Sequence, residues 1–248
     1  MTHAARTMID AYMHLDIGAA APLADLRQRL DEAGLTGALV VETWDGRNFD
    51  LLARAEADVF DGIGVAYCYR GQSRVELQSL LARQRVWSLR ADAHSLARDD
   101  FPAELIARER KWLLSHAETG IAALLPLLLY WTQRQPDLKI YVPHLGWPRR
   151  DGADDVGWIE AMTRLANIPT IVVGVSALAH FSNLPFPHDD MRPFVERLCA
   201  LFGAGRIVVG SDYPNSGAAM YAAQHALATR WVSAALPLWS HHDHGLRP

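Results

Sequence analysis

Polar side chains that can carry out chemistry follow several short apolar runs in this sequence of 248 residues. His14, His116, His144 and Asp212 each come within a few residues after such a run. A neutral imidazole offers one acceptor nitrogen, and a carboxylate can take a proton from an attacking water or face a metal ion. If the fold brings these groups together, they predict a site that activates water.

The elements that would position these groups alternate regularly along the chain. Short β-branched apolar runs, typical of strands buried on both faces, alternate with segments whose apolar residues recur at helical spacing. The expected strands cover residues 8–12, 37–41, 62–67, 86–90, 112–115, 139–142, 170–174 and 206–210. The expected helices cover residues 22–33, 50–58, 74–85, 102–110, 121–134, 156–166, 190–202 and 218–235. These pairs predict an α/β protein with a (β/α)8 TIM barrel, whose active site lies at the carboxyl ends of the strands.

A doubly wound sheet is the competing fold class. It generally has about five or six parallel strands and a glycine fingerprint after the first of them. No such fingerprint follows residues 8–12, and neither a repeat nor a low-complexity linker divides the chain. We therefore expect a single domain over residues 1–248, with residues 237–248 as a flexible tail.

Three segments at the ends of expected strands carry a family resemblance. Residues 9–14 (IDAYMH), 143–148 (PHLGWP) and 209–214 (VGSDYP) resemble the signatures of the amidohydrolase-related (family 2) branch of the amidohydrolase superfamily. The resemblance spans about residues 8 to 216. It implies a barrel hydrolase, lactonase or decarboxylase that acts on a small, often carboxylated or cyclic substrate, with a divalent metal in many members. Such proteins commonly carry His-x-His after the first strand, whereas Tyr12 stands at the first of these positions here.

The expected catalytic residues are Asp212, His144 and His14. Asp212 would activate water, and His144 with His14 would polarise a substrate carbonyl. Positions two apart in an extended strand point to the same face, so His14 and Tyr12 should project together. The structural alternatives are a helix cap or turn residue for Asp212 and loop histidines bonded to backbone for His144 and His14.

The expected substrate-binding residues are two arginines and two aromatic residues. Arg90 and Arg70 could each hold a carboxylate through a bidentate fork, although an ion pair with Asp92 or Asp100 is the competing interpretation of Arg90. The aromatic candidates are Tyr12 and Trp147; Trp44 could also cover a flat ring.

A metal ion is the open question about cofactors. His14, His116 and Asp212 could hold one divalent ion, with zinc or manganese suited to mixed nitrogen and oxygen ligands. The phenol of Tyr12 coordinates a metal only when it is deprotonated, which its ordinary pKa near ~10 makes costly. Glu118 is interpreted either as a neighbour of His116 at the site or as an acidic residue at the start of a helix.

Composition narrows the possible partners and location. With 24 basic and 28 acidic residues the formal charge is -4, which does not favour nucleic acid. The most apolar segment, residues 121–131, is shorter than the ~20 residues of a membrane span. Two cysteines imply no disulfide framework, and residues 1–10 lack a secretion signal. We expect a cytoplasmic enzyme for a small molecule, with homo-oligomer formation left open.

The preferred function is hydrolysis of a lactone or amide-like bond in a small carboxylated or cyclic substrate. A metal-dependent decarboxylase of an aromatic acid would use the same residues, and a catalytically inactive barrel that serves as a binding module is the alternative from another class. Residues 179–190 form a long proline-containing connection that could act as a lid. The histidines of residues 239–244 are interpreted as part of a solvated terminus.

Overall fold

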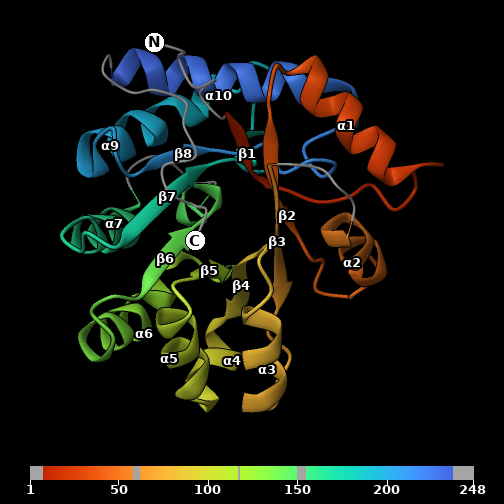
Figure 1. The fold of residues 1–248 in the computed structure, drawn as a ribbon. Coiled ribbons are helices and arrows are strands. Elements are labelled where there is room, and N and C mark those ends of the chain that lie inside the picture. Colours follow the sequence, from red (N-terminus) through yellow and green to blue (C-terminus); the bar gives the residue numbers. More distant parts are fainter. Residues whose placement is uncertain (1–7, 58–61, 117, 150–154, 237–248) are drawn as a thin grey trace, which may run out of the picture.

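The computed structural model describes residues 8–57, 62–116, 118–149 and 155–236. Eight strands lie in chain order in one sheet, each parallel to the next, and helices surround them (Figure 1). The strands are β1 Ile9–Met13, β2 Gly37–Val41, β3 Ile63–Cys68, β4 Val86–Asp92, β5 Trp112–His116, β6 Lys139–Val142, β7 Ile171–Val175 and β8 Ile207–Val209. The α-helices are α1 Pro22–Glu32, α2 Phe49–Ala57, α3 Arg74–Leu81, α4 Ala93–Arg98, α5 Phe101–Arg108, α6 Ile121–Arg134, α7 Val156–Ala166, α8 Leu178–Phe181, α9 Arg192–Phe202 and α10 Tyr221–Ala235. The predicted (β/α)8 barrel is confirmed.

Two short helices, α4 and α8, were not expected from the sequence. Helix α4 has six residues and begins after Asp92, whose side chain accepts a hydrogen bond from the Ser95 amide. Helix α8 has four residues. Segments this short carry too few turns for helical periodicity to show. Strand β4 also continues to Asp92, so Arg90 lies inside the strand rather than at its end.

The buried apolar residues form two layers, one between the strands and helices and one inside the barrel. The inner layer contains the large rings of Tyr12, Trp87, Trp112 and Tyr141. A Cβ atom at Gly64 would overlap the Trp87 ring, so this strand position has to be glycine for the indole to fill the barrel. The layered interior is a packed core, and any site must therefore lie above it.

A β-bulge in β1 turns the chemistry-bearing residues inward. Between Asp10 and Met13, β1 has one residue more than the facing part of β2, so Ala11 and Tyr12 both lie in the inner layer. Met13 then packs in the outer layer. Without the bulge, strict alternation would have sent Tyr12 outward together with His14.

The Asp10 side chain stabilises both this bulge and the seam of the barrel, where β1 meets β8. Its Oδ1 accepts hydrogen bonds from the amide of Tyr12 (3.1 Å) and from the amide of Ser211 (2.9 Å), just after β8. The Asp212 amide then donates to the Tyr12 carbonyl (2.9 Å). A Cβ atom at Gly210 would lie 2.7 Å from the Tyr12 nitrogen, so glycine permits this close approach.

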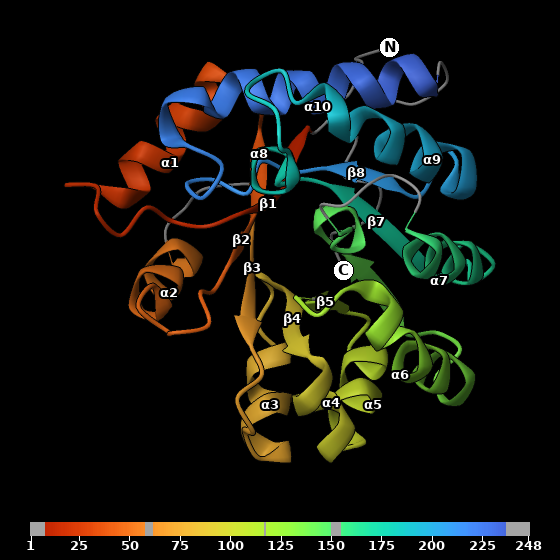
Figure 2. The same ribbon diagram turned by 180° about the vertical axis from the view of Figure 1, so that it is seen from behind.

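Strands β6, β7 and β8 are each followed by a residue with left-handed backbone. His144 after β6, Ala177 after β7 and Asp212 after β8 have φ values of 54°, 58° and 59°. Such conformations cost about 1–3 kcal/mol for a residue with a side chain, and they cluster at functional sites. Figure 2 shows this end of the barrel, with α8 in front of the strands.

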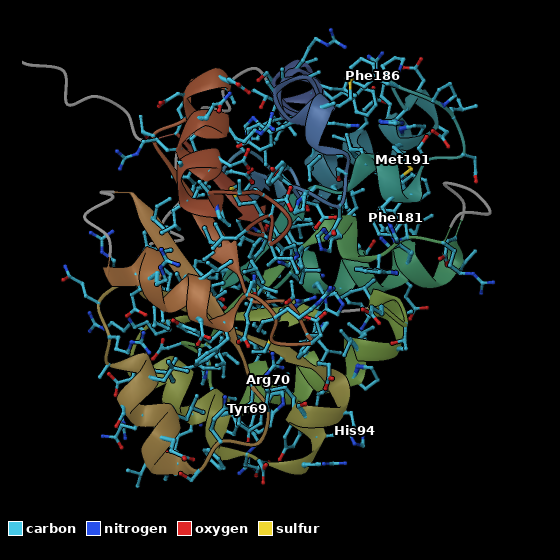
Figure 3. The ribbon with its side chains drawn as sticks, turned by 90° about the vertical axis from the view of Figure 1, so that its right-hand side faces the viewer. Tyr69, Arg70, His94, Phe181, Phe186 and Met191 are labelled. Atoms are coloured by element: carbon cyan, nitrogen blue, oxygen red, sulfur yellow. The ribbon has the colours of Figure 1, made fainter. Side chains whose placement is uncertain are left out.

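The connection between β7 and α9, which contains the predicted lid, is held by hydrogen bonds within it and to α10. Asp190 accepts from the Ser182 hydroxyl and the Asn183 amide (2.7 Å), and Gln224 of α10 bonds to His188 (3.0 Å). Figure 3 shows Phe181, Met191 and Phe186 along one side of the molecule, well away from Tyr69, Arg70 and His94. A lid motion stays a prediction. The expected tail, residues 237–248, lies outside the described residues.

We expect the Asp10→Ala variant to lose about 2–4 kcal/mol in the free energy of unfolding, because two buried amides lose their acceptor. Asp10→Asn keeps an acceptor oxygen and should lose less. Urea denaturation followed by circular dichroism measures both values. Equal losses in the two variants, or no loss in either, would contradict the role given to the carboxyl oxygen.

Candidate active site

A cavity of about 310 Å³ opens at the carboxyl end of the barrel. Its lining comes from β1, β4 and β5 and from the segments that follow β1, β5, β6, β7 and β8, namely Tyr12, His14, Arg90, His116, Glu118, His144, Trp147, Ala177, His180, Asp212 and Asn215. The structure thus brings together all the expected site residues except Arg70.

Asp212 is a buried carboxyl group, with 6% of its surface exposed. Burial raises its pKa to about 7, while the Asn215 amide and the Arg90 charge act in the opposite direction. Its Oδ1 lies 3.8 Å from His14 Nε2 and 4.0 Å from His144 Nε2. These gaps are too long for direct hydrogen bonds and leave room for one oxygen atom between the three groups.

The two imidazoles beside Asp212 both direct Nε2 toward it, but the two nitrogens differ in protonation. His14 Nδ1 donates to the Val41 carbonyl (2.7 Å), which leaves Nε2 as an acceptor in the neutral ring. Ser176 Oγ accepts the His144 amide and lies 3.0 Å from His144 Nδ1; a hydroxyl donated to Nδ1 leaves Nε2–H as a donor. Burial lowers the pKa of His14 to about 4 and that of His144 well below its ordinary value, so both rings are neutral near pH 7.

Arg90 is fixed from three sides in the cavity wall. Its Nη1 donates to the Glu42 carbonyl (2.8 Å), its Nη2 contacts His116 Nδ1 (2.9 Å), and its guanidinium lies 4.4 Å from the Trp44 ring. Because arginine can only donate, His116 Nδ1 is the acceptor, and His116 Nε2–H donates to Glu118 (2.8 Å). Burial and the Arg90 charge lower the pKa of His116 to about 4.

Arg70 has a different position from the one expected. Its Nη2 pairs with Glu42 (2.6 Å), and it donates to the carbonyls of Trp44 (3.0 Å) and Thr43 (2.9 Å). Glu42 is 2% exposed and also accepts the Cys68 amide (2.6 Å). Arg70 therefore lies outside the cavity and holds the loop that places the Trp44 ring against Arg90.

Three polar residues near the cavity were not expected as site residues from the sequence. His180 and Asn215 line it, and Ser176 orients His144. His180 lies in the predicted lid segment, and its ring contacts Trp147, with centroids 5.6 Å apart. The order of residues gives no signal for Ser176, because its role depends on the packing of two strand ends.

Two further hollows meet the cavity at Glu118. One of about 450 Å³ is lined by Trp147, Arg149 and Phe181 among others, and one of about 520 Å³ by Trp44, Asp92 and His94 among others. Glu118 lines all three. An elongated ligand therefore has room to extend beyond the cavity.

The arrangement of these side chains does not fit a divalent metal ion well. Within the part of the chain that the structure describes, no group of three His, Cys, Asp or Glu side chains could hold one. Both ring nitrogens of His116 are engaged by Arg90 and Glu118, and burial raises the pKa of Tyr12, which keeps the phenol protonated. The set His14, His116 and Asp212 stays a prediction.

Comparison with curated proteins finds a lactonase that is similar to part of this chain. An L-fucono-1,5-lactonase from Burkholderia ambifaria is 32% identical over 110 residues, which cover 43% of this chain and 37% of the relative. The chain thus matches little more than a third of that protein's length.

Solved structures match nearly the whole chain at low identity. An amidohydrolase from Burkholderia multivorans with bound zinc has a TM-score of 0.74 at 18% identity, covering 93% of both chains. A protein from Pseudomonas putida provisionally named 2-pyrone-4,6-dicarboxylic acid hydrolase has a TM-score of 0.72 at 21% identity, covering 94% of both. The 5-carboxyvanillate decarboxylase of Sphingomonas paucimobilis has a TM-score of 0.60 at 12% identity, covering 93% of both. These matches show the fold.

Among the described residues, no helix has the length and apolar character needed to cross a bilayer.

A family model extends over most of the chain. The model for the amidohydrolase family (Amidohydro_2) matches residues 12–237, including the strand ends that build the cavity. The chain belongs to the amidohydrolase family.

Proposed function

We propose that this protein hydrolyses the ester bond of a small, uncharged lactone. The observation that carries the proposal is the position of Asp212, a buried carboxyl group with a pKa of about 7, facing the Nε2 atoms of two neutral imidazoles. One water molecule bound between them would donate one hydrogen to Asp212 and one to His14, and would accept one from His144. General-base catalysis works best when the pKa of the base lies near the working pH.

The reaction follows from this placement. Asp212 takes a proton as the water oxygen attacks the lactone carbonyl carbon, and the C=O electron pair moves onto the carbonyl oxygen. When the tetrahedral intermediate collapses, the ring C–O bond breaks and protonated Asp212 returns its proton to the departing alkoxide. The product is an open-chain hydroxy acid, which releases a proton to solvent.

The charges of the cavity favour a neutral substrate over a carboxylated one. Arg90 already donates through Nη1 to the Glu42 carbonyl and through Nη2 to His116, so fewer of its N–H groups are left to pair with a carboxylate. Asp212 and Glu118 add negative charge to the same lining. The rings of Tyr12 and Trp147 provide apolar faces for a compact ring.

We expect L-fucono-1,5-lactone, a neutral ring, to be hydrolysed with a kcat/KM at least about tenfold above that for 2-pyrone-4,6-dicarboxylate, because like charges repel the dianion. Proton release in weak buffer, corrected for spontaneous opening, measures both rates. A preference for the dicarboxylate would contradict the charge argument. Carbon dioxide released from aromatic acids would support decarboxylation instead, and inactivity toward all lactones would support a binding module.

The Asp212→Asn variant should lose at least about 10²-fold in kcat because it removes the base and keeps the shape. In the native enzyme kcat/KM should rise with pH through about 7, as Asp212 becomes ionised. A variant that stays folded and keeps near-full activity would refute this role for Asp212.

A stability measurement provides the control for that variant. The folded pKa of Asp212 lies above its ordinary value of 3.8, so the folded protein binds this proton more tightly than the unfolded chain does. The destabilising effect of the ionised group therefore grows as pH rises from about 4 to above 7. Asp212→Asn should raise the Tm relative to the native protein at pH 8, with a smaller difference at pH 4.

We expect lactone hydrolysis to survive metal chelation. The proposed groups act as acids, bases and hydrogen-bond donors, and both nitrogens of His116 are already engaged. Activity is compared before and after prolonged dialysis against dipicolinate, with elemental analysis of both samples. A loss of activity that returns with stoichiometric zinc or manganese would restore the predicted metal site.

A further inference from the structure

Two buried hydrogen-bond donors in the cavity wall have no acceptor among the described residues. They are the hydroxyl of Tyr12 and the Nε–H of Arg90. Both residues line the cavity that contains Asp212. A buried donor without a partner costs about 1–3 kcal/mol, so the pair is complementary to an acceptor that a ligand would bring.

The surroundings hold both donors in place. Arg90 is fixed through its terminal nitrogens and the Trp44 ring, while its Nε–H has no acceptor in the described part of the chain. The Tyr12 ring packs edge-on against His144 and His14, with centroid distances of 4.3 and 5.3 Å. The charge of Arg90 lowers the pKa of the Tyr12 phenol, against the larger effect of burial, and both side chains line the same cavity.

We propose that the Tyr12 hydroxyl and the Arg90 Nε–H form a two-donor site that receives the substrate's carbonyl oxygen and stabilises its negative charge during attack by water. The inference rests on the proposed lactone hydrolysis and assigns the carbonyl end of that reaction. As the water oxygen bonds to the carbonyl carbon, the C=O electron pair moves to the oxygen facing these donors. When the ring C–O bond breaks, the pair returns to re-form C=O.

This assignment gives the groups of the cavity separate tasks. Asp212 and His14 accept the hydrogens of water, whereas Tyr12 and Arg90 donate to the carbonyl oxygen. A neutral phenol and a cation keep their protons throughout, so neither competes with Asp212 for the proton. Fixed donors aimed at developing charge are effective because they need no reorganisation during the reaction.

The first test compares two tyrosines of the same kind. Tyr12→Phe should lower kcat on L-fucono-1,5-lactone by about 10²-fold, the usual effect of removing one such donor, and change KM much less. Tyr141 is the matched control: its hydroxyl is also buried without an acceptor, but it packs in the barrel interior and does not line the cavity. Tyr141→Phe should leave kcat nearly unchanged, and both variants should have a Tm at or above the native value, because each loses a buried hydroxyl that has no acceptor within the described ranges. Equal effects of the two substitutions would overturn the proposal.

The second test does not depend on turnover. In the Asp212→Asn background, which removes the neighbouring carboxylate, 4-nitrophenolate mimics the oxyanion and nitrobenzene is its uncharged counterpart. Calorimetry at pH 8 should show that adding Tyr12→Phe weakens 4-nitrophenolate binding by at least about tenfold, the equivalent of one lost charged hydrogen bond. Nitrobenzene binding should not change, and adding Tyr141→Phe should alter neither.

The two tests distinguish failure of the donor site from failure of the proposed function. Tyr12-dependent phenolate binding without any lactone hydrolysis would support the two-donor site and overturn the proposed function. Lactone hydrolysis that depends on Asp212, combined with phenolate binding that is indifferent to Tyr12, would overturn the donor site and keep the function.

Discussion

The buried carboxyl group of Asp10 is the constraint on which the site depends. One oxygen accepts the amide that the β1 bulge exposes, at Tyr12, and the amide of Ser211 across the barrel seam. The next residue, Asp212, bonds back to the Tyr12 carbonyl. The same few bonds therefore turn Tyr12 and His14 inward and set Asp212 opposite them. Burial raises the pKa of Asp10 to about 6, although the hydrogen bonds from Ser211 and Tyr12 act in the opposite direction.

The cavity keeps most of its ionisable groups uncharged by the same physical means. Burial raises the pKa of Asp212 and lowers the pKa of His14, His116 and His144, so each shift moves its group toward the neutral form. Arg90 keeps its charge and is compensated through fixed contacts. With a pKa of about 7, Asp212 can exchange a proton near pH 7 beside imidazoles that stay neutral.

The sequence predicted the barrel because buried strands and amphipathic helices impose different periods on the chain. It also placed Asp212 and His144 correctly at the ends of strands, since apolar runs end where the core ends. It could not place Arg70, whose long side chain reaches back to Glu42 instead of entering the cavity. The β1 bulge was equally hidden, because one extra residue leaves the apolar pattern almost unchanged. Strict alternation explains why Tyr12 and His14 lie on the same face of the strand, but the bulge is what turns that face inward.

Tyrosine at position 12 is consistent with the cation beside it. A divalent metal in this cavity would share a low-dielectric space with the Arg90 guanidinium, and like charges repel strongly there. A phenol avoids that conflict: it is neutral, it donates one hydrogen bond, and the positive charge of Arg90 supports the same acceptor. The Arg90 guanidinium packs against the Trp44 ring. Arg70 fixes the loop that carries Trp44, because it bonds both to the Trp44 carbonyl and to the Glu42 carboxylate. A change at Arg70, outside the cavity, would thus affect Arg90 and the proposed carbonyl-binding donors through direct contacts, whereas Asp212 and its two imidazoles make no contact with Arg70.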